Sequence, residues 1–357
     1  MLSRLSLLRL AALAAATVLA AGGVRPVAAA EPQPPRDLRD TGLYAEGAGF
    51  VPRPGLLSFT PQYPLWSDGA SKRRWIALPP GRAIDAARPD AWQFPPGTRL
   101  WKEFAFGGRR IETRYIERRA DGRWLFATYV WNAAGTQATL APAEGIAALP
   151  REDAPDGRYD IPARDDCKAC HESAAVPVLG FSALQLSPER DPNAVQGTAP
   201  AASDVDLPRL VQQGRLRHLP PALMRTPPRI AAASADERAA LGYLHANCGH
   251  CHNADGAPAP VALRLAQTVA APEAATQQVL RSLTLTPARW RPAGAPADVP
   301  PVLPGRPEAS ALLQRMHSRQ PQAQMPPLGT RVPDAEGLAL LTRWIQHDLV
   351  TPKETTP

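Results

Sequence analysis

The chain has few of the side chains that bind metals and redox cofactors, and they are unevenly placed. In 357 residues it holds four cysteines, four methionines and seven histidines, and residues 31–166 contain none of the three types. That region therefore cannot supply these ligands to a metal or a haem. Since every histidine follows residue 170, no Ser-His-Asp order that would indicate a catalytic triad stands out, and no general acid–base pair is evident.

Long apolar runs and long basic runs are also missing. After the first 30 residues no stretch reaches the roughly 18 consecutive apolar residues that a membrane-spanning helix needs. The formal net charge of +7 falls to +4 without the three arginines of residues 1–30. A charge this small, with no basic run, gives no reason to expect nucleic acid as a partner.

The N-terminus has the pattern of a secretory signal. Basic residues (Arg4 and Arg9) precede a short apolar run, and the small residues Ala28, Ala29 and Ala30 follow it. We predict a cleaved signal peptide over residues 1–30. The mature chain is then expected to be soluble and periplasmic, with no membrane span after cleavage.

All four cysteines fall in two copies of one pentapeptide, Cys-x-x-Cys-His. In c-type cytochromes the two thiols of this motif bond to the vinyl groups of a haem, and the histidine becomes the proximal iron ligand. We therefore predict two covalently attached haem c groups. The cysteines expected to hold them are Cys167, Cys170, Cys248 and Cys251, and the expected proximal ligands are His171 and His252.

Zinc and dithiol chemistry are the alternatives. A zinc site would need the two cysteine pairs to meet in space. They lie 81 positions apart, beyond the usual zinc-ribbon spacing, and zinc does not explain a histidine directly after both pairs. A thioredoxin-like pair is expected near a βαβ pattern, and none surrounds either motif. The motifs therefore favour haem.

Composition divides the mature chain near residue 160. Residues 31–160 hold six of the eight tryptophans, and alternating apolar residues on both sides of Asp121-Gly122 predict a β-hairpin. No helical period of any length interrupts this region, which we expect to be a small antiparallel β-sandwich. Residues 161–233 are expected to form the first haem-attachment segment and a proline-rich linker.

The C-terminal part has helical patterns. Ser234 and Glu237 form a capping box that opens a helix running into the second motif. Two further helices are expected, one from Glu308 to His317 and one starting at Pro333. We therefore predict an all-α cytochrome c domain with the second haem over residues 234–357. The predicted fold class is α+β.

A distal iron ligand for the second haem is also expected. Met325 lies in a proline-stiffened loop just before the last helix, and Met/His ligation raises the reduction potential of a haem. Met316 is the competitor, but it lies on an apolar helical face and is expected in the core. His250, inside the second motif, is expected to face solvent.

The distal ligand of the first haem is left open. Met224 and His218 flank the Pro220-Pro221 step of the linker and are the first candidates. His245 and His317 are alternatives, and so is an open, five-coordinate iron.

The segment between Trp66 and Trp75 is rich in charge. It would form a docking surface or approach haem propionates, or it would be a strand with exposed charges and buried aromatic residues. The charged residues are Asp68, Lys72, Arg73 and Arg74.

Several segments together resemble a family of exported bacterial dihaem c-type cytochromes whose physiological role is poorly defined. They are residues 63–70, 72–75, 94–98, 112–114, 129–132, 161–164, 247–252 and 325–329. The resemblance covers most of the mature chain. It implies an N-terminal β-domain, a first haem site and a C-terminal cytochrome c module, without a known substrate.

The expected function is single-electron transfer between periplasmic donor and acceptor proteins, which makes the chain a carrier rather than a catalyst. One alternative is the electron-accepting subunit of a periplasmic dehydrogenase. The other is a dihaem peroxidase-like enzyme with one open haem.

Overall fold

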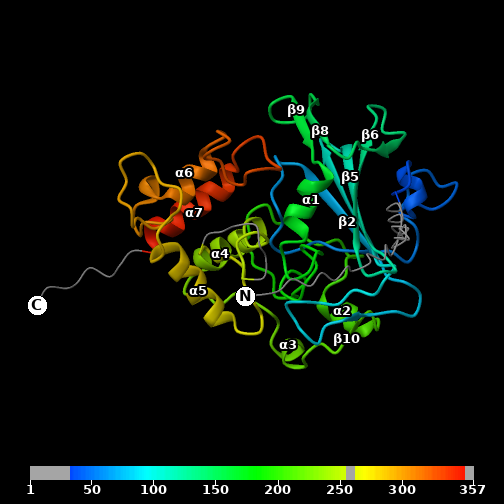
Figure 1. Cartoon of the computed structure of the whole chain (residues 1–357). Helices are drawn as coiled ribbons and strands as arrows, with labels where there is room; N and C mark the ends of the chain where they lie inside the picture. Colours follow the sequence, from blue (N-terminus) through cyan, green and yellow to red (C-terminus); the bar gives the residue numbers. More distant parts are fainter. Residues whose placement is uncertain (1–32, 255–261, 350–357) are drawn as a thin grey trace, which may run out of the picture. The chain divides into compact units, whose positions relative to one another are not determined.

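The computed structural model describes residues 33–254 and 262–349, and the predicted signal peptide lies outside them. From Pro34 onward the chain forms one compact unit (Figure 1). The strands are β1 (Leu57–Ser58), β2 (Ser71–Ala77), β3 (Ile84–Asp85), β4 (Arg99–Phe106), β5 (Arg109–Arg118), β6 (Trp124–Trp131), β7 (Ala138–Leu140), β8 (Ile146–Pro150), β9 (Arg158–Ile161) and β10 (Leu216–Arg217). The helices are α1 (Arg164–His171), α2 (Leu207–Gln212), α3 (Ala222–Arg225), α4 (Ala235–Asn247), α5 (Pro272–Thr284), α6 (Ala311–His317) and α7 (Ala335–His347), with 3-10 helices η1 (Leu38–Thr41) and η2 (Pro307–Ala309).

The main sheet has six antiparallel strands in the order β1-β2-β4-β5-β6-β7. The hairpin predicted around Asp121-Gly122 is confirmed, because β5 pairs with β6 from Arg118 and Trp124 onward. Gly122 has a φ of +82°, a left-handed conformation that glycine adopts without strain. Two small two-stranded sheets, β3 with β10 and β8 with β9, stand beside the main sheet.

The two faces of the main sheet are covered differently. On one face Trp75, Trp101 and Tyr129 form a buried cluster that the segment 38–56 covers through Leu43 and Tyr44. On the other face α1 contacts β6, and Figure 1 draws α1 beside the sheet. The second layer is therefore made of helices and irregular chain. The predicted β-sandwich is wrong, because no second large sheet faces the first within the described residues.

The predicted separate all-α cytochrome c domain is also wrong. The apolar faces of α4 and α7 do form, with Leu241 and Trp344 fully buried. They belong to the same buried cluster as Ile76 of β2 and Leu100 of β4. The helical period correctly indicated amphipathic helices, but it does not reveal which surface an apolar face will contact. The molecule is a mixed α/β fold whose largest sheet has six antiparallel strands.

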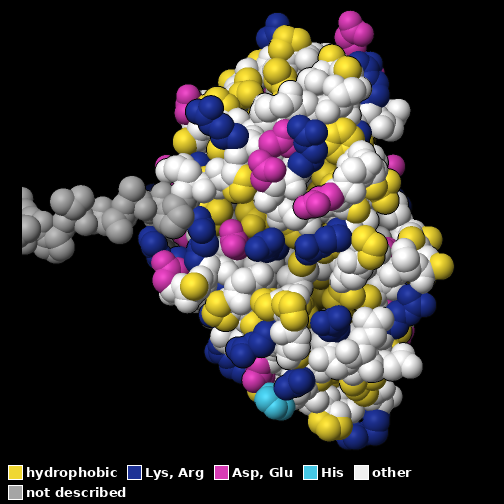
Figure 2. Space-filling view, turned by 90° about the vertical axis from the view of Figure 1, so that its right-hand side faces the viewer, with side chains coloured by type: hydrophobic (Ala, Val, Ile, Leu, Met, Phe, Trp, Pro, Cys, Tyr) yellow, Lys and Arg dark blue, Asp and Glu magenta, His cyan; other side chains and the backbone are white. Residues whose placement is uncertain are grey.

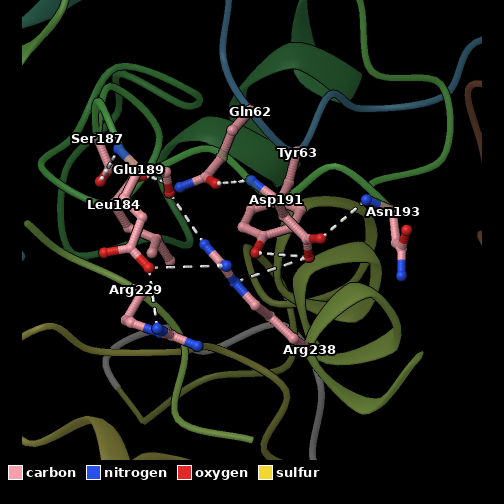
Figure 3. A network of polar contacts seen from close by, with 9 residues as sticks. All are labelled: Gln62, Tyr63, Leu184, Ser187, Glu189, Asp191, Asn193, Arg229 and Arg238. Atoms are coloured by element: carbon pink, nitrogen blue, oxygen red, sulfur yellow. Dashed lines mark hydrogen bonds and ion pairs between the residues drawn. The ribbon is translucent and has the colours of Figure 1, made fainter. Parts of the chain in front are cut away.

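Close packing at one glycine joins α4 to the segment that precedes β2. A Cβ atom at Gly242 of α4 would overlap the ring of Tyr63. Because glycine lacks that atom, the segment before β2 can lie directly against the helix. The same cluster carries a polar network, shown in Figure 3. Tyr63 donates its hydroxyl to Asp191 at 3.1 Å, and Arg238 of α4 donates to the carbonyl of Glu189 at 2.9 Å.

Two of the three helix starts that the sequence indicated are correct. The third is not, because Glu308 lies in the 3-10 helix η2 and α6 begins only at Ala311. Ser234 accepts from the amide of Glu237 at 2.9 Å and begins α4, and Asp334 accepts from the amide of Gly337 at 3.1 Å and begins α7. Helix α5 was not predicted.

The surface carries mixed charge. On the face drawn in Figure 2, Lys and Arg side chains are interspersed with Asp and Glu and with apolar groups. In the described part of the chain, no helix combines the length and the apolar character that crossing a membrane requires.

Candidate functional site

The first Cys-x-x-Cys-His motif occupies the end of α1. This helix begins after Ala163, whose amide donates to the carboxylate of Asp166 at 2.9 Å. The motif is only partly buried, and it lies over the sheet because α1 contacts β6. Burial raises the pKa of the Cys167 thiol. This cysteine is therefore a neutral thiol at neutral pH.

The imidazole of His171 is held in one protonation state. Its Nδ1 lies 2.6 Å from the carbonyl oxygen of Pro177, and its ring centroid is 5.3 Å from that of Phe126 in β6. A carbonyl can only accept, so Nδ1 carries the proton and the Nε2 lone pair is free. Burial lowers the pKa of His171 to about 4, which keeps the ring neutral. A neutral imidazole oriented by a carbonyl is what metal ligation requires.

The second motif follows α4 directly. The amide of Cys248 donates to the carbonyl of Leu244 at 2.9 Å and ends the helix. The next residue must be small, because a Cβ atom on Gly249 would lie 2.6 Å from the carbonyl oxygen of His245. The chain then turns, and the amide of His252 donates to the carbonyl of Cys248 at 2.9 Å. Residues 255–261 lie outside the described part.

His252 has an unused buried nitrogen. Its Nδ1 has no hydrogen-bond partner among the described residues. Burial lowers the pKa of His252 to about 4, so the ring is neutral here as well. A buried polar atom without a partner is costly, so this nitrogen needs an acceptor or donor that the described residues do not supply.

The two motifs meet. The ligand atoms of Cys170, His250 and Cys251 all lie within 4.8 Å of one another. Asn253 joins the motifs from below, since its side-chain amide donates to the carbonyl of Ser173 at 3.0 Å. The sequence analysis treated the two motifs as separate sites and expected His250 in solvent. His250 is only partly buried, and one of its ring nitrogens lies beside the sulfurs of Cys170 and Cys251.

The two converging thiols share a hydrogen bond. This bond raises the pKa of Cys170 to about 12 and lowers that of Cys251. Cys251 is thus the first of the two to deprotonate. Cys248, in contrast, is buried against the apolar core, and burial raises its pKa to about 12. Neither Cys167 nor Cys248 belongs to the three-residue group.

Met325 is related to the second motif only through a shared neighbour, Arg315. Its amide donates to the carbonyl of Arg315 at 2.9 Å, and the charge of Arg315 acts, after burial, to lower the pKa of His252. Met316 is 7% exposed and belongs to the core, as expected. Ligation by Met325 stays a prediction.

The candidate distal ligands of the first motif lie elsewhere. Met224 is 39% exposed in α3. His218 is exposed too, with its Nδ1 2.9 Å from a carboxylate oxygen of Asp85. His245 is already used structurally, because its Nδ1 accepts the amide of Gln267 at 3.0 Å. His317, at the end of α6, is exposed. The assignments of Met224 and His218 as ligands stay predictions.

Sequence reasoning missed two residues at the junction, His250 and Asn253. Neither belongs to the fixed positions of the motif, and only the meeting of α1 with the turn after α4 gives them a role. Comparison with models of known protein families, with curated proteins and with solved structures finds no match. The functional argument therefore depends on the residues of the site.

The described residues fit covalent haem attachment. Both motifs carry thiols that are not joined in disulfides. The histidine of each motif is neutral, and the Nδ1 of His171 is held by the carbonyl of Pro177, which leaves its Nε2 free. These are the donors that c-type haem requires.

Proposed function

We propose that this chain is an exported, periplasmic dihaem c-type cytochrome that passes single electrons between a donor and an acceptor protein. The observation that supports it best is the meeting of the two Cys-x-x-Cys-His motifs, whose Cys170 and Cys251 sulfurs belong to one group of atoms within 4.8 Å. Two haems attached there would be anchored next to each other, which suits electron passage inside one chain.

Each motif would attach and ligate one haem. Cys167 and Cys170 would hold one haem and Cys248 and Cys251 the other, each pair through thioether bonds. His171 and His252 would be the proximal ligands, and the carbonyl of Pro177 would keep the His171 ring oriented. Each haem, when bound, supplies one reversible one-electron step. Met325 is the proposed distal ligand at the second site.

A second candidate function has one observation in its favour. Cys170, His250 and Cys251 together offer a thiolate-rich site for a soft metal such as zinc. Against it, the group supplies three protein ligands where a structural zinc site uses four, and it leaves Cys167 and Cys248 without a role.

A redox titration followed by optical and EPR spectroscopy tests the proposal, with zinc content measured on the same sample. We expect two one-electron steps that are not independent, because reducing one haem changes the charge felt by its neighbour. Low-spin spectra in both states would support electron transfer. A haem that is high-spin, or becomes so on half-reduction, would favour the peroxidase-like alternative.

Stoichiometric zinc without haem absorption would support the zinc site and overturn the proposed haem function. Co-purification with a dehydrogenase would identify the chain as an electron-accepting subunit.

A further inference from the structure

A row of cations crosses the face of the main sheet that α1 covers. Arg74 of β2 is paired in register with Lys102 of β4, and Lys102 is paired with Arg114 of β5. Side chains at paired positions of adjacent strands point to the same side of a sheet. Lys72, two residues before Arg74, lies on that side as well. We call these four residues the inner cationic row.

The inner cationic row has little negative charge to balance it. Arg114 pairs with Glu112 at 2.6 Å. For Lys72, Arg74 and Lys102, no carboxylate lies within ion-pair distance in the described parts of the chain. Lys102 and Arg114 instead lie over the ring of Phe104, at 4.8 and 4.4 Å from its centroid, which stabilises each charge only modestly.

The charges are also poorly hydrated. Arg74 is 9% exposed. Burial, followed by repulsion from Arg74 and Arg114, lowers the pKa of Lys72 to about 7. The same two causes, burial first, hold the pKa of Lys102 well below its usual range. Four cations gathered away from water with one paired carboxylate, Glu112, are unfavourable. Asp204 attracts Arg74, and Asp334 and Asp68 attract Lys72, only from beyond ion-pair distance. Such an arrangement is explained if an anionic group binds to it.

The inner cationic row lies close to the first motif. Thr128 continues the row on β6, and Phe126, two residues away on the same strand and face, contacts the ring of His171. After burial, the charges of Lys102 and Arg114 lower the pKa of His171. Arg114 also acts on the thiol of Cys167. The cations therefore face the residues that would hold the first haem.

We propose that Arg74, Lys102 and Arg114 bind the two propionate carboxylates of the haem attached at Cys167 and Cys170. This inference rests on the proposed function. Together with Glu112, two carboxylates would balance three of the four charges of the row. Arginine and lysine form strong charge-assisted hydrogen bonds with carboxylates. A haem held this way has its apolar body near Phe126 and its charged edge on the sheet.

The test uses the haem-loaded protein with Lys102→Met and Arg74→Met, which remove a charge and keep an apolar stem. Arg39→Met is the matched control, because Arg39 lies in η1 on the opposite face of the sheet and pairs with Asp37 at 2.7 Å. Intact mass first counts the haems and so reports on the proposed function separately. Resonance Raman spectra then report the propionate bending modes, and a redox titration reports the potentials.

We expect both row variants to carry two haems, to shift the propionate mode of one haem and to lower its midpoint potential, whereas Arg39→Met changes neither. A lower potential with an unchanged propionate mode would mean that the cations act only from a distance, and would overturn the inference. Unchanged values in both measurements would overturn it too. If the methionine variants fail to accumulate, Lys102→Gln and Arg74→Gln, which remove the charge but keep a polar head, are measured in the same way.

Discussion

The orientation of His171 is set by a single backbone carbonyl. Its Nδ1 donates to Pro177 at 2.6 Å, which leaves Nε2 free to ligate. We expect His171→Ala to keep the thioether bonds of its motif but to abolish the low-spin signal of one haem, about half of the total. His347→Ala removes an exposed histidine that is no candidate ligand, and it should leave both signals intact. The low-spin signals are measured in EPR spectra of the oxidised protein. Two intact low-spin signals in His171→Ala would contradict the assignment of His171 as a proximal ligand.

His245 gives the fold a defined acid sensitivity. Burial lowers its pKa from about 6.5 to about 4. Between these two pKa values the unfolded chain binds a proton at His245 that the folded chain does not bind. The contribution of His245 to the free energy of unfolding is therefore fully present above pH 6.5 and is lost as the pH falls to about 4. Over that window the loss amounts to about 3 kcal/mol.

Denaturant unfolding between pH 7 and 4 measures this loss. His245→Gln, which can still accept the amide of Gln267, should make the curve flatter, whereas exposed His347→Gln should not. Equal slopes in both variants would contradict the role given to His245.

At the scale of the elements, the packing of α4 against Tyr63 depends on the absence of a side chain at position 242. A methyl group there would overlap the ring of Tyr63. In an exposed helix, replacing glycine by alanine gains about 1 kcal/mol. Here we expect Gly242→Ala to lower the free energy of unfolding by about 1–3 kcal/mol, because overpacking outweighs helix propensity.

A double-mutant cycle tests this explanation. In a Tyr63→Ala background the ring is gone, and Gly242→Ala should cost nothing or stabilise. A cost that persists without the ring would show that the helix, and not its contact with Tyr63, is strained.

The elements also show what sequence could predict. The hairpin at Asp121-Gly122 and the caps Ser234 and Asp334 were predictable, because turn and cap chemistry is local. The meeting of Cys170 with Cys251 was not, because it joins residues 81 positions apart through packing. Likewise, the alternation in β4 places Lys102 on a face, but only the covering helix α1 explains why that face matters.

At the scale of the whole molecule, the C-terminal helices share a core with the sheet. Leu241 and Trp344 belong to the same cluster as Ile76 and Leu100. A fragment of residues 234–349 would expose that surface, so we expect it not to fold alone, although the helical pattern suggested an independent domain. Circular dichroism and the dispersion of amide signals in NMR spectra show whether the fragment is folded. A cooperative thermal transition in the fragment would contradict the single core.

The central claim is that two haems are attached at the two juxtaposed motifs. Intact mass spectrometry of the mature protein, made in a host that attaches haem to Cys-x-x-Cys-His, tests it most directly. We predict the mass of the chain plus two haems, and of the chain plus one haem when Cys248 and Cys251 are both replaced by serine. The mass of the bare chain, with a disulfide or with zinc in place of haem, would contradict the account.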